Sequence, residues 1–292
     1  MEEMQVILKA RQFIRDAGVA EIPVDIEKLA AAATARIKVV HDLADDESGQ
    51  TTQIKGKHVI IVNGNHREER QRFTVLHELA HIFLGLPSQH HGEKLTTDTL
   101  ISYQRRPKEE ILCDVFAAEC LLPYNLFSRD VGDMDISLEA VKELAERYKA
   151  SLTTTGSRFA VSAPEPCAFV LSENGRVRYV SRSKFLAELG GWITFNSPLP
   201  TRSVALRLFQ GTSKTEDYDE LATDVWFDGG VKNLPMLNEE AIFLSEWNQC
   251  LSLIWFDNDR RPERYDPDED EDPLLRELDG NLPWPSRGRR RS

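Results

Sequence analysis

The sequence of 292 residues is poor in cysteine, which occurs four times, at positions 113, 120, 167 and 250. No two of these residues form a Cys-x-x-Cys pair, and their spacing predicts neither a zinc ribbon nor a disulfide framework. We interpret them as reduced, buried side chains, as is usual in a protein of the cytoplasm.

Long apolar runs are also missing, and we expect no leader sequence. No window approaches the roughly 18 consecutive apolar residues of a membrane helix. The acidic start MEEMQVILKARQF has no basic region followed by an apolar stretch. Lys and Arg number 36 against 48 Asp and Glu, a formal net charge of −12 that phosphate backbones repel. We expect a cytoplasmic location, no membrane partner and no direct nucleic-acid binding.

The spacing of apolar residues predicts an α+β chain. Helical periodicity covers residues 2–17, 68–84, 108–122, 137–149 and 152–161. Strand-like runs occupy residues 36–40, 50–55 and 57–62. After Pro164 the pattern changes to a hairpin around Glu173-Asn174-Gly175, followed by strand-like runs at 222–229 and 241–256.

These changes of pattern divide the chain into four predicted parts. Residues 1–130 form a small sheet with helices, and residues 131–163 form a helical segment like a helix-turn-helix. Residues 164–257 form a smaller α/β or mostly β module, for which we expect a sensory or substrate-docking role. Residues 258–292, an acidic block before a basic end, are expected to be a mobile tail.

The stretch FTVLHELAHIFLG, residues 73–85, places three ionisable side chains in an apolar helix. His77 and His81 are four residues apart and share one helix face, so both imidazoles reach one zinc ion at about 2.0–2.1 Å. Glu78 projects about 100° round the helix, where it can take a proton from a metal-bound water. Buried ionisable groups are costly without a partner, and a divalent cation supplies one. The stretch predicts a zinc site, with manganese as the alternative.

A catalytic zinc site needs a third protein ligand. The metzincin pattern fails because Leu84 and Pro87 stand where it requires Gly and His. The next helix, EEILCDVFAAECLLP, offers Glu110 as a ligand and Asp114 as an acceptor for the second N–H of a ligand histidine. The alternative interpretation of Glu110 and Asp114 is a solvated helix face.

RFTVLHELAH followed by E-x-x-x-D-x-F-A-A-E-x-L-L-P resembles the ImmA/IrrE family of metallopeptidases. The resemblance runs from about residue 23 to residue 123 and continues more weakly to about residue 160. It implies a zincin-like metallopeptidase domain in which His77, His81 and Glu110 bind the metal and Glu78 is the general base.

The chain departs from the family pattern at two positions. Cys113 and Asp114 stand where the family usually has Ala-Asn. Compared with asparagine, Asp114 keeps an oxygen that accepts hydrogen bonds but lacks the NH2 group that donates them. We expect Asp114 to accept the N–H of a ligand histidine. We interpret Cys113 as a small packing residue, with a redox-sensitive thiol as the alternative.

The resemblance implies a metallo-endopeptidase whose protein substrate is a helix-turn-helix repressor, in stress or mobile-element control. One alternative is a toxin or interaction partner of a repressor-like antitoxin, with a structural metal. Another is a DNA-binding regulator that uses residues 136–162, which we interpret instead as helix packing because they are rich in acids.

Other features of the site stay open in the sequence. An extended substrate could pair with an edge presented by the strand 59–62, whose alternative interpretation is an interior strand. Donors to a developing oxyanion could come from Tyr103, Tyr124, His90 or His91, and the two histidines are also alternative metal ligands.

Overall fold

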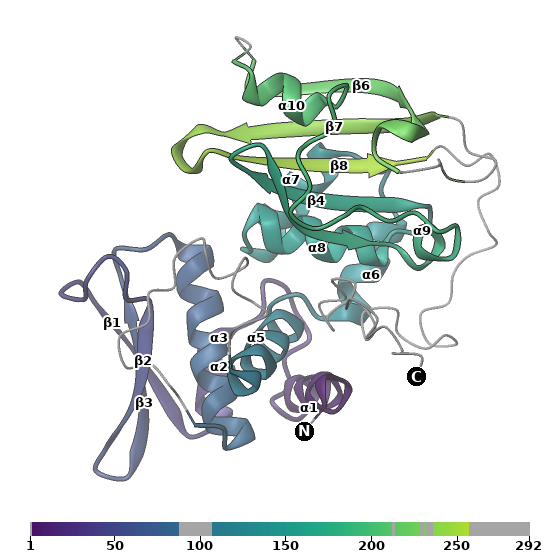
Figure 1. The fold of residues 1–292 in the computed structure, drawn as a ribbon. Helices are drawn as coiled ribbons and strands as arrows, with labels where there is room; N and C mark the ends of the chain where they lie inside the picture. The colour runs from purple at the N-terminus through teal and green to yellow at the C-terminus, as the bar shows by residue number, and fades with distance from the viewer. Residues whose placement is uncertain (1, 88–106, 212–213, 228–230, 232–235, 257–292) are drawn as a thin grey trace, which may run out of the picture.

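The computed structural model describes residues 2–87, 107–211, 214–227, 231 and 236–256. A three-stranded sheet with its helices is followed by a five-stranded antiparallel sheet (Figure 1). The α+β class predicted from the sequence is therefore confirmed. Most of the stretch between the predicted helices 68–84 and 108–122, and the whole of the predicted tail 258–292, lie outside the described residues.

The first part of the chain forms a small sheet with a long helix packed against it, and further helices on the other side of that helix. It contains α1 (Glu3–Asp16), α2 (Ile26–Ala32), β1 (Ala35–Val40), β2 (Gly49–Ile54), β3 (Lys57–Asn63), α3 (Glu68–Leu84) and α5 (Lys108–Leu121). Asp25 begins α2, because its side chain accepts a hydrogen bond from the Lys28 backbone N–H. Gly85 ends α3 in the left-handed conformation that glycine adopts without strain.

The strand order in the small sheet is β1-β3-β2, with β3 parallel to β1 and antiparallel to β2. Of the two interpretations of the strand 59–62, the interior strand is confirmed and the edge is excluded, because β3 lies between the other two strands. Its β-branched run VIIV suits this interior place, whereas the more polar GQTTQI of β2 lies at the edge.

The second part wraps a five-stranded sheet with helices. It contains α6 (Tyr124–Gly132), α7 (Leu138–Tyr148), α8 (Leu152–Ser162), β4 (Cys167–Glu173), β5 (Arg176–Arg182), α9 (Lys184–Glu188), α10 (Val204–Phe209), β6 (Glu216–Ala222), η2 (Thr223–Val225), β7 (Met236–Leu244), η3 (Ser245–Trp247) and β8 (Gln249–Trp255). The strand order is β5-β4-β8-β7-β6.

Two apolar cores meet at β4. Phe169 and Leu171 point into the core shared with α1, α3, α5 and α8, while Ala168 and Val170 point into the core under α10. The first core therefore contains residues from both sides of the boundary predicted near residue 164. That boundary stays a prediction.

Two elements of the second part differ from the sequence-based expectation. The run 222–229 was expected to be a strand, but Thr223–Val225 form a 3-10 turn, and the Trp226 indole N–H donates to the buried Glu239 carboxylate. The strand lies just before it, as β6. Among the described residues, no single helix is long and apolar enough to cross a membrane, and α5 with α6 passes that test only as a pair bent by 55°.

Candidate metal centre

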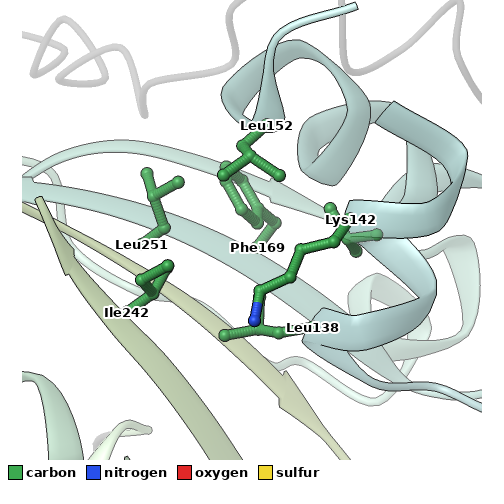
Figure 2. A pocket seen from close by; sticks show the side chains of 7 residues that line it. Leu138, Lys142, Leu152, Phe169, Ile242 and Leu251 are labelled. Carbon is green, nitrogen blue, oxygen red and sulfur yellow. The ribbon is translucent and has the colours of Figure 1, made fainter. Parts of the chain in front are cut away.

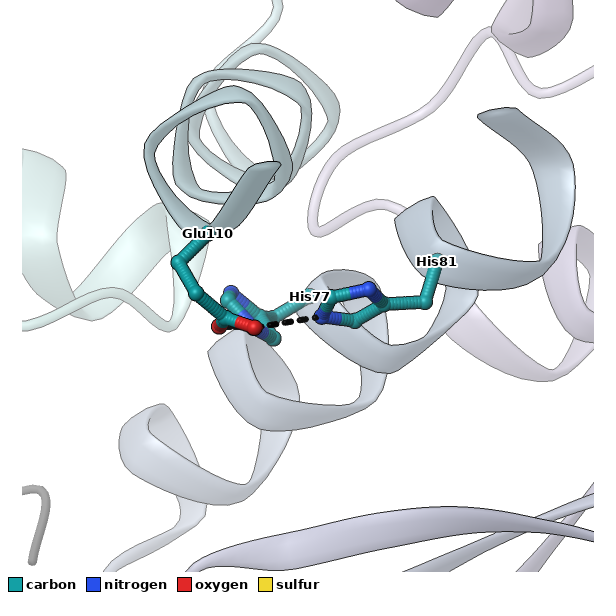
Figure 3. Close-up of side chains that lie close together, drawn as sticks. All are labelled: His77, His81 and Glu110. Carbon is teal, nitrogen blue, oxygen red and sulfur yellow. Dashed lines mark hydrogen bonds and ion pairs between the residues drawn. The ribbon is translucent and has the colours of Figure 1, made fainter. Parts of the chain in front are cut away.

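Two helices bring the candidate metal ligands together. α3 lies between the small sheet and α5, and it carries His77 and His81 one turn apart on the face that meets α5. Glu110 extends from the first turn of α5 towards both imidazoles (Figure 3). All three residues are buried, at 5% exposure each.

The ligand atoms converge on one point. Nε2 of His77 lies 3.1 Å from Oε2 of Glu110 and 3.2 Å from Nε2 of His81, and Nε2 of His81 lies 3.6 Å from Oε1 of Glu110. One donor atom from each of the three residues fits within a distance of 4.8 Å. Two imidazoles and one carboxylate are a donor set that zinc takes in open sites, so the residues fit a metal ion.

Hydrogen bonds at the far side of each ring orient the two imidazoles. Nδ1 of His77 donates to Oδ1 of Asp114 at 2.8 Å, and Nδ1 of His81 lies 3.3 Å from the Leu86 carbonyl oxygen. An N–H at Nδ1 leaves the lone pair of a neutral imidazole on Nε2, the atom that faces the other ligands. Asp114 lies one helical turn after Glu110 on α5 and accepts this hydrogen bond from His77.

The electrostatics of the cluster show that it holds charge in a buried place. Burial lowers the pKa of the His77 imidazole, but hydrogen bonds to Asp114 and Glu110 more than offset this and raise it to about 10. Burial raises the pKa of Glu110, but hydrogen bonds with His77 and His81 hold it well below its usual range. Without a metal, the cluster is therefore an imidazolium–carboxylate pair at neutral pH.

Glu78 lies beside the cluster, on the next face of α3, and is 1% exposed. Its Oε2 accepts a hydrogen bond from Thr51 Oγ1 of β2 at 2.8 Å. Sequence reasoning missed Thr51, because a threonine in a strand is ordinary and the contact depends on how β2 lies against α3.

Other candidates lie elsewhere. Tyr124 begins α6, beyond the end of the helix that carries Glu110. Its ring lies beneath the guanidinium groups of Arg11 and Arg158, 5.1 and 5.7 Å from the ring centroid. Cys113 is fully buried in the core between α3 and α5, as a packing residue would be. His90, His91 and Tyr103 lie outside the described residues.

Comparisons with known proteins point to one family. The IrrE N-terminal-like domain matches residues 28–159. The radiation response metalloprotease IrrE of Deinococcus deserti is 29% identical over 167 residues, which are 55% of each chain. The protein of the same name from Deinococcus radiodurans is 28% identical over 167 residues, 55% of this chain and 49% of its own. The chain thus spans about half the length of the curated relatives it matches.

A solved structure shares the fold more broadly. A transcriptional regulator of Mycobacterium tuberculosis aligns with a TM-score of 0.58 and 13% identity, over 87% of this chain and 76% of its own. At this identity the likeness concerns the fold alone. Residues 28–159, the part that matches the IrrE N-terminal-like domain, hold both histidines, the three acidic residues of the site and Thr51.

Proposed function

We propose that this chain is a zinc-dependent metallo-endopeptidase of the cytoplasm that cleaves a regulatory protein. One observation carries the proposal: two imidazoles and a carboxylate converge on one buried point, with a second carboxylate held beside it. Two relatives named as metalloproteases support the same reading. Manganese is the alternative metal.

The residues divide the work by their positions. His77, His81 and Glu110 would hold the ion, and Asp114 would keep the His77 ring in place. A zinc ion bound there would lower the pKa of a water molecule and polarise a substrate carbonyl. The Glu78 carboxylate would accept the proton of that water and pass it to the amine nitrogen of the departing peptide.

The edge of the small sheet is the proposed place for the substrate. β2 is one of the two edge strands of the small sheet, and its Thr51 contacts the proposed general base, Glu78. An extended segment that pairs with the outer edge of β2 would lie next to Glu78. For the substrate itself we propose a helix-turn-helix repressor, which follows from the family resemblance of the sequence.

The test uses the purified full chain loaded with zinc and the repressor encoded next to its gene, followed by intact-mass analysis. We expect a cut at a defined bond, and we expect Glu78→Gln to slow it by about 10²–10⁴-fold with zinc retained, since general base catalysis has that worth. Glu69→Gln, the same change near the start of α3, is the matched control and should cut normally.

A library of unstructured peptides serves as a second substrate. If the chain cleaves the peptide library but leaves the repressor intact, only the assignment of the repressor as substrate is overturned. Undiminished cleavage by zinc-loaded Glu78→Gln overturns the peptidase mechanism. A zinc-loaded chain that binds the repressor but cuts nothing overturns the peptidase proposal in favour of a binding partner with a structural metal.

A further inference from the structure

β2 lies against α3 closely enough for their residues to face each other in pairs. A Cβ built on Gly49 would lie 2.7 Å from Cγ2 of Thr74 and 2.5 Å from the Ile61 carbonyl oxygen, so only glycine fits at this crossing. Two residues later, the Thr51 hydroxyl meets the Glu78 carboxylate. The close approach at Gly49 brings the next residue on that face of the strand within reach of α3.

The contacts Gly49–Thr74 and Thr51–Glu78 follow one another along β2 and α3, because two residues of strand and four residues of helix cover similar distances. Two residues of strand span about 6.8 Å, and four residues of helix span about 6.0 Å. Gly49 and Thr51 are two apart on β2, while Thr74 and Glu78 are four apart on α3. The register of β2 therefore decides which side chain reaches Glu78.

The hydroxyl of Thr51 has no packing reason to be there. Its cross-strand neighbour on the same face, Ile60, is fully buried under α3, and a valine would have the same shape as threonine. What the hydroxyl adds is a hydrogen bond to a carboxylate that is 1% exposed, where polar groups need partners.

We propose that Thr51 is a positioning residue that fixes the orientation of the Glu78 carboxylate for proton transfer. The terminal torsion of a glutamate is broad, so the plane of its carboxylate is free to turn unless a bond restrains it. The bond from Thr51 to Oε2 supplies that restraint from a different element. The inference rests on the proposed peptidase function.

Three variants of the zinc-loaded full chain test it on the peptide library. Thr51→Val removes the hydroxyl and keeps the shape, so we expect kcat to fall about 10- to 100-fold, the worth of a hydrogen bond to a charged group. KM and zinc affinity should stay unchanged, and Tm should fall by a few degrees because a buried carboxylate loses a hydrogen bond. Thr51→Ser should restore most of kcat. Thr201→Val, the same change at an exposed turn outside the small sheet, is the control and should behave as wild type.

Infrared spectroscopy gives a readout independent of activity. The Glu78 carboxylate stretch, obtained as the difference between wild type and Glu78→Gln, should shift in Thr51→Val and return in Thr51→Ser. An unchanged kcat in Thr51→Val overturns the role of Thr51 in an active enzyme. A loss of kcat that serine does not restore, or that follows a loss of zinc affinity, overturns it as well. A wild-type chain that cuts nothing overturns the proposed function and the role of Thr51 with it, even where the infrared shift is seen.

Discussion

Asp114 supports the metal site through a hydrogen bond to a ligand histidine. Its Oδ1 accepts the Nδ1–H of His77 at 2.8 Å, while its own side chain is 19% exposed. Removing the acceptor leaves a buried N–H without this partner and frees the ring to turn. Asp114→Ala should therefore weaken zinc binding by about 10- to 100-fold.

Asp114→Asn is the informative companion variant, because the amide keeps an oxygen that can accept the His77 proton. We expect it to lose less affinity than alanine, and it restores the residue that the family usually has there. Competition with a chromophoric zinc chelator measures both. Equal affinities for Asp114→Ala and wild type would show that Asp114 is a solvated surface residue.

The raised pKa of His77 predicts how zinc binding depends on pH. A pKa of about 10 means that the metal-free imidazole is protonated at neutral pH, so zinc must displace a proton to bind. The apparent dissociation constant should fall about tenfold for each unit rise in pH through the neutral range. Chelator competition at several pH values measures this, and calorimetry in two buffers of different ionisation enthalpy counts the proton. An affinity independent of pH would contradict the charge state.

The raised pKa of His77 also determines how the stability of the metal-free fold changes with pH. Because it is raised above the unfolded value of 6.5, His77 stabilises the fold fully below about pH 6.5. That contribution is lost as the pH rises towards 10. Zinc-loaded protein should not share this loss, since its imidazole carries no proton to release.

The site residues that the sequence predicts are those whose spacing along a single helix brings their side chains together. His77 and His81 lie one turn apart on one helix, with Glu78 directly after His77, and the Glu110–Asp114 pair repeats the four-residue spacing on the next helix. Thr51 stands 27 residues before Glu78, and nothing in the spacing of either segment encodes their contact. It follows from the register of a strand against a helix, which only the folded chain specifies.

Among the elements, those with strong periodicity were predicted and those that depend on tertiary context were not. α6 has no counterpart among the predicted helices. Pro123, directly after the predicted helix 108–122, indicates a helix end, although proline also suits a helix start. β6, EDYDELA, has few apolar residues because it is the edge strand of its sheet. The strand predicted at 222–229 was drawn from buried aromatic residues that pack from a turn.

α8 and β4 meet at a glycine, which gives a test of their packing. A Cβ on Gly156 would lie 2.3 Å from Cε2 of Phe169, whose ring is fully buried. Gly156→Ala should therefore lower the free energy of unfolding by about 1–3 kcal/mol, because a crowded core cannot yield without strain. Gly132→Ala, at an open helical position, is the control and should be neutral or stabilising by up to about 1 kcal/mol. Chemical denaturation measures both, and equal stabilities would contradict the tight contact.

Across the whole molecule, a buried ion cluster joins three helices. Glu119 on α5 is fully buried and accepts hydrogen bonds from Arg11 of α1 at 2.9 Å and from Arg158 of α8 at 2.6 Å. Arg158 also donates to the Leu122 carbonyl oxygen at 2.7 Å. The cluster therefore connects the first helix of the chain to the helix that covers the five-stranded sheet.

Breaking this cluster should be costly. Glu119→Gln leaves two guanidinium groups without their counter-charge, and we expect a loss of about 3–5 kcal/mol in the free energy of unfolding. Asp224→Asn makes the same chemical change in the exposed pair with Arg202, where both side chains are more than half exposed, and should cost less than about 1 kcal/mol. If both variants lose a similar amount of free energy of unfolding, the buried cluster stabilises the fold no more than the exposed pair does.

The burial of β4 on both faces has a practical consequence for work with fragments. Phe169 and Leu171 complete the core of the helices before it, and Ala168 and Val170 complete the core after it. A fragment that stops ahead of β4 would expose the apolar side of α8 to water, and such surfaces promote aggregation. Loss of activity on truncation would then report insolubility, and single substitutions in the full-length chain are the sounder way to assign roles to its parts.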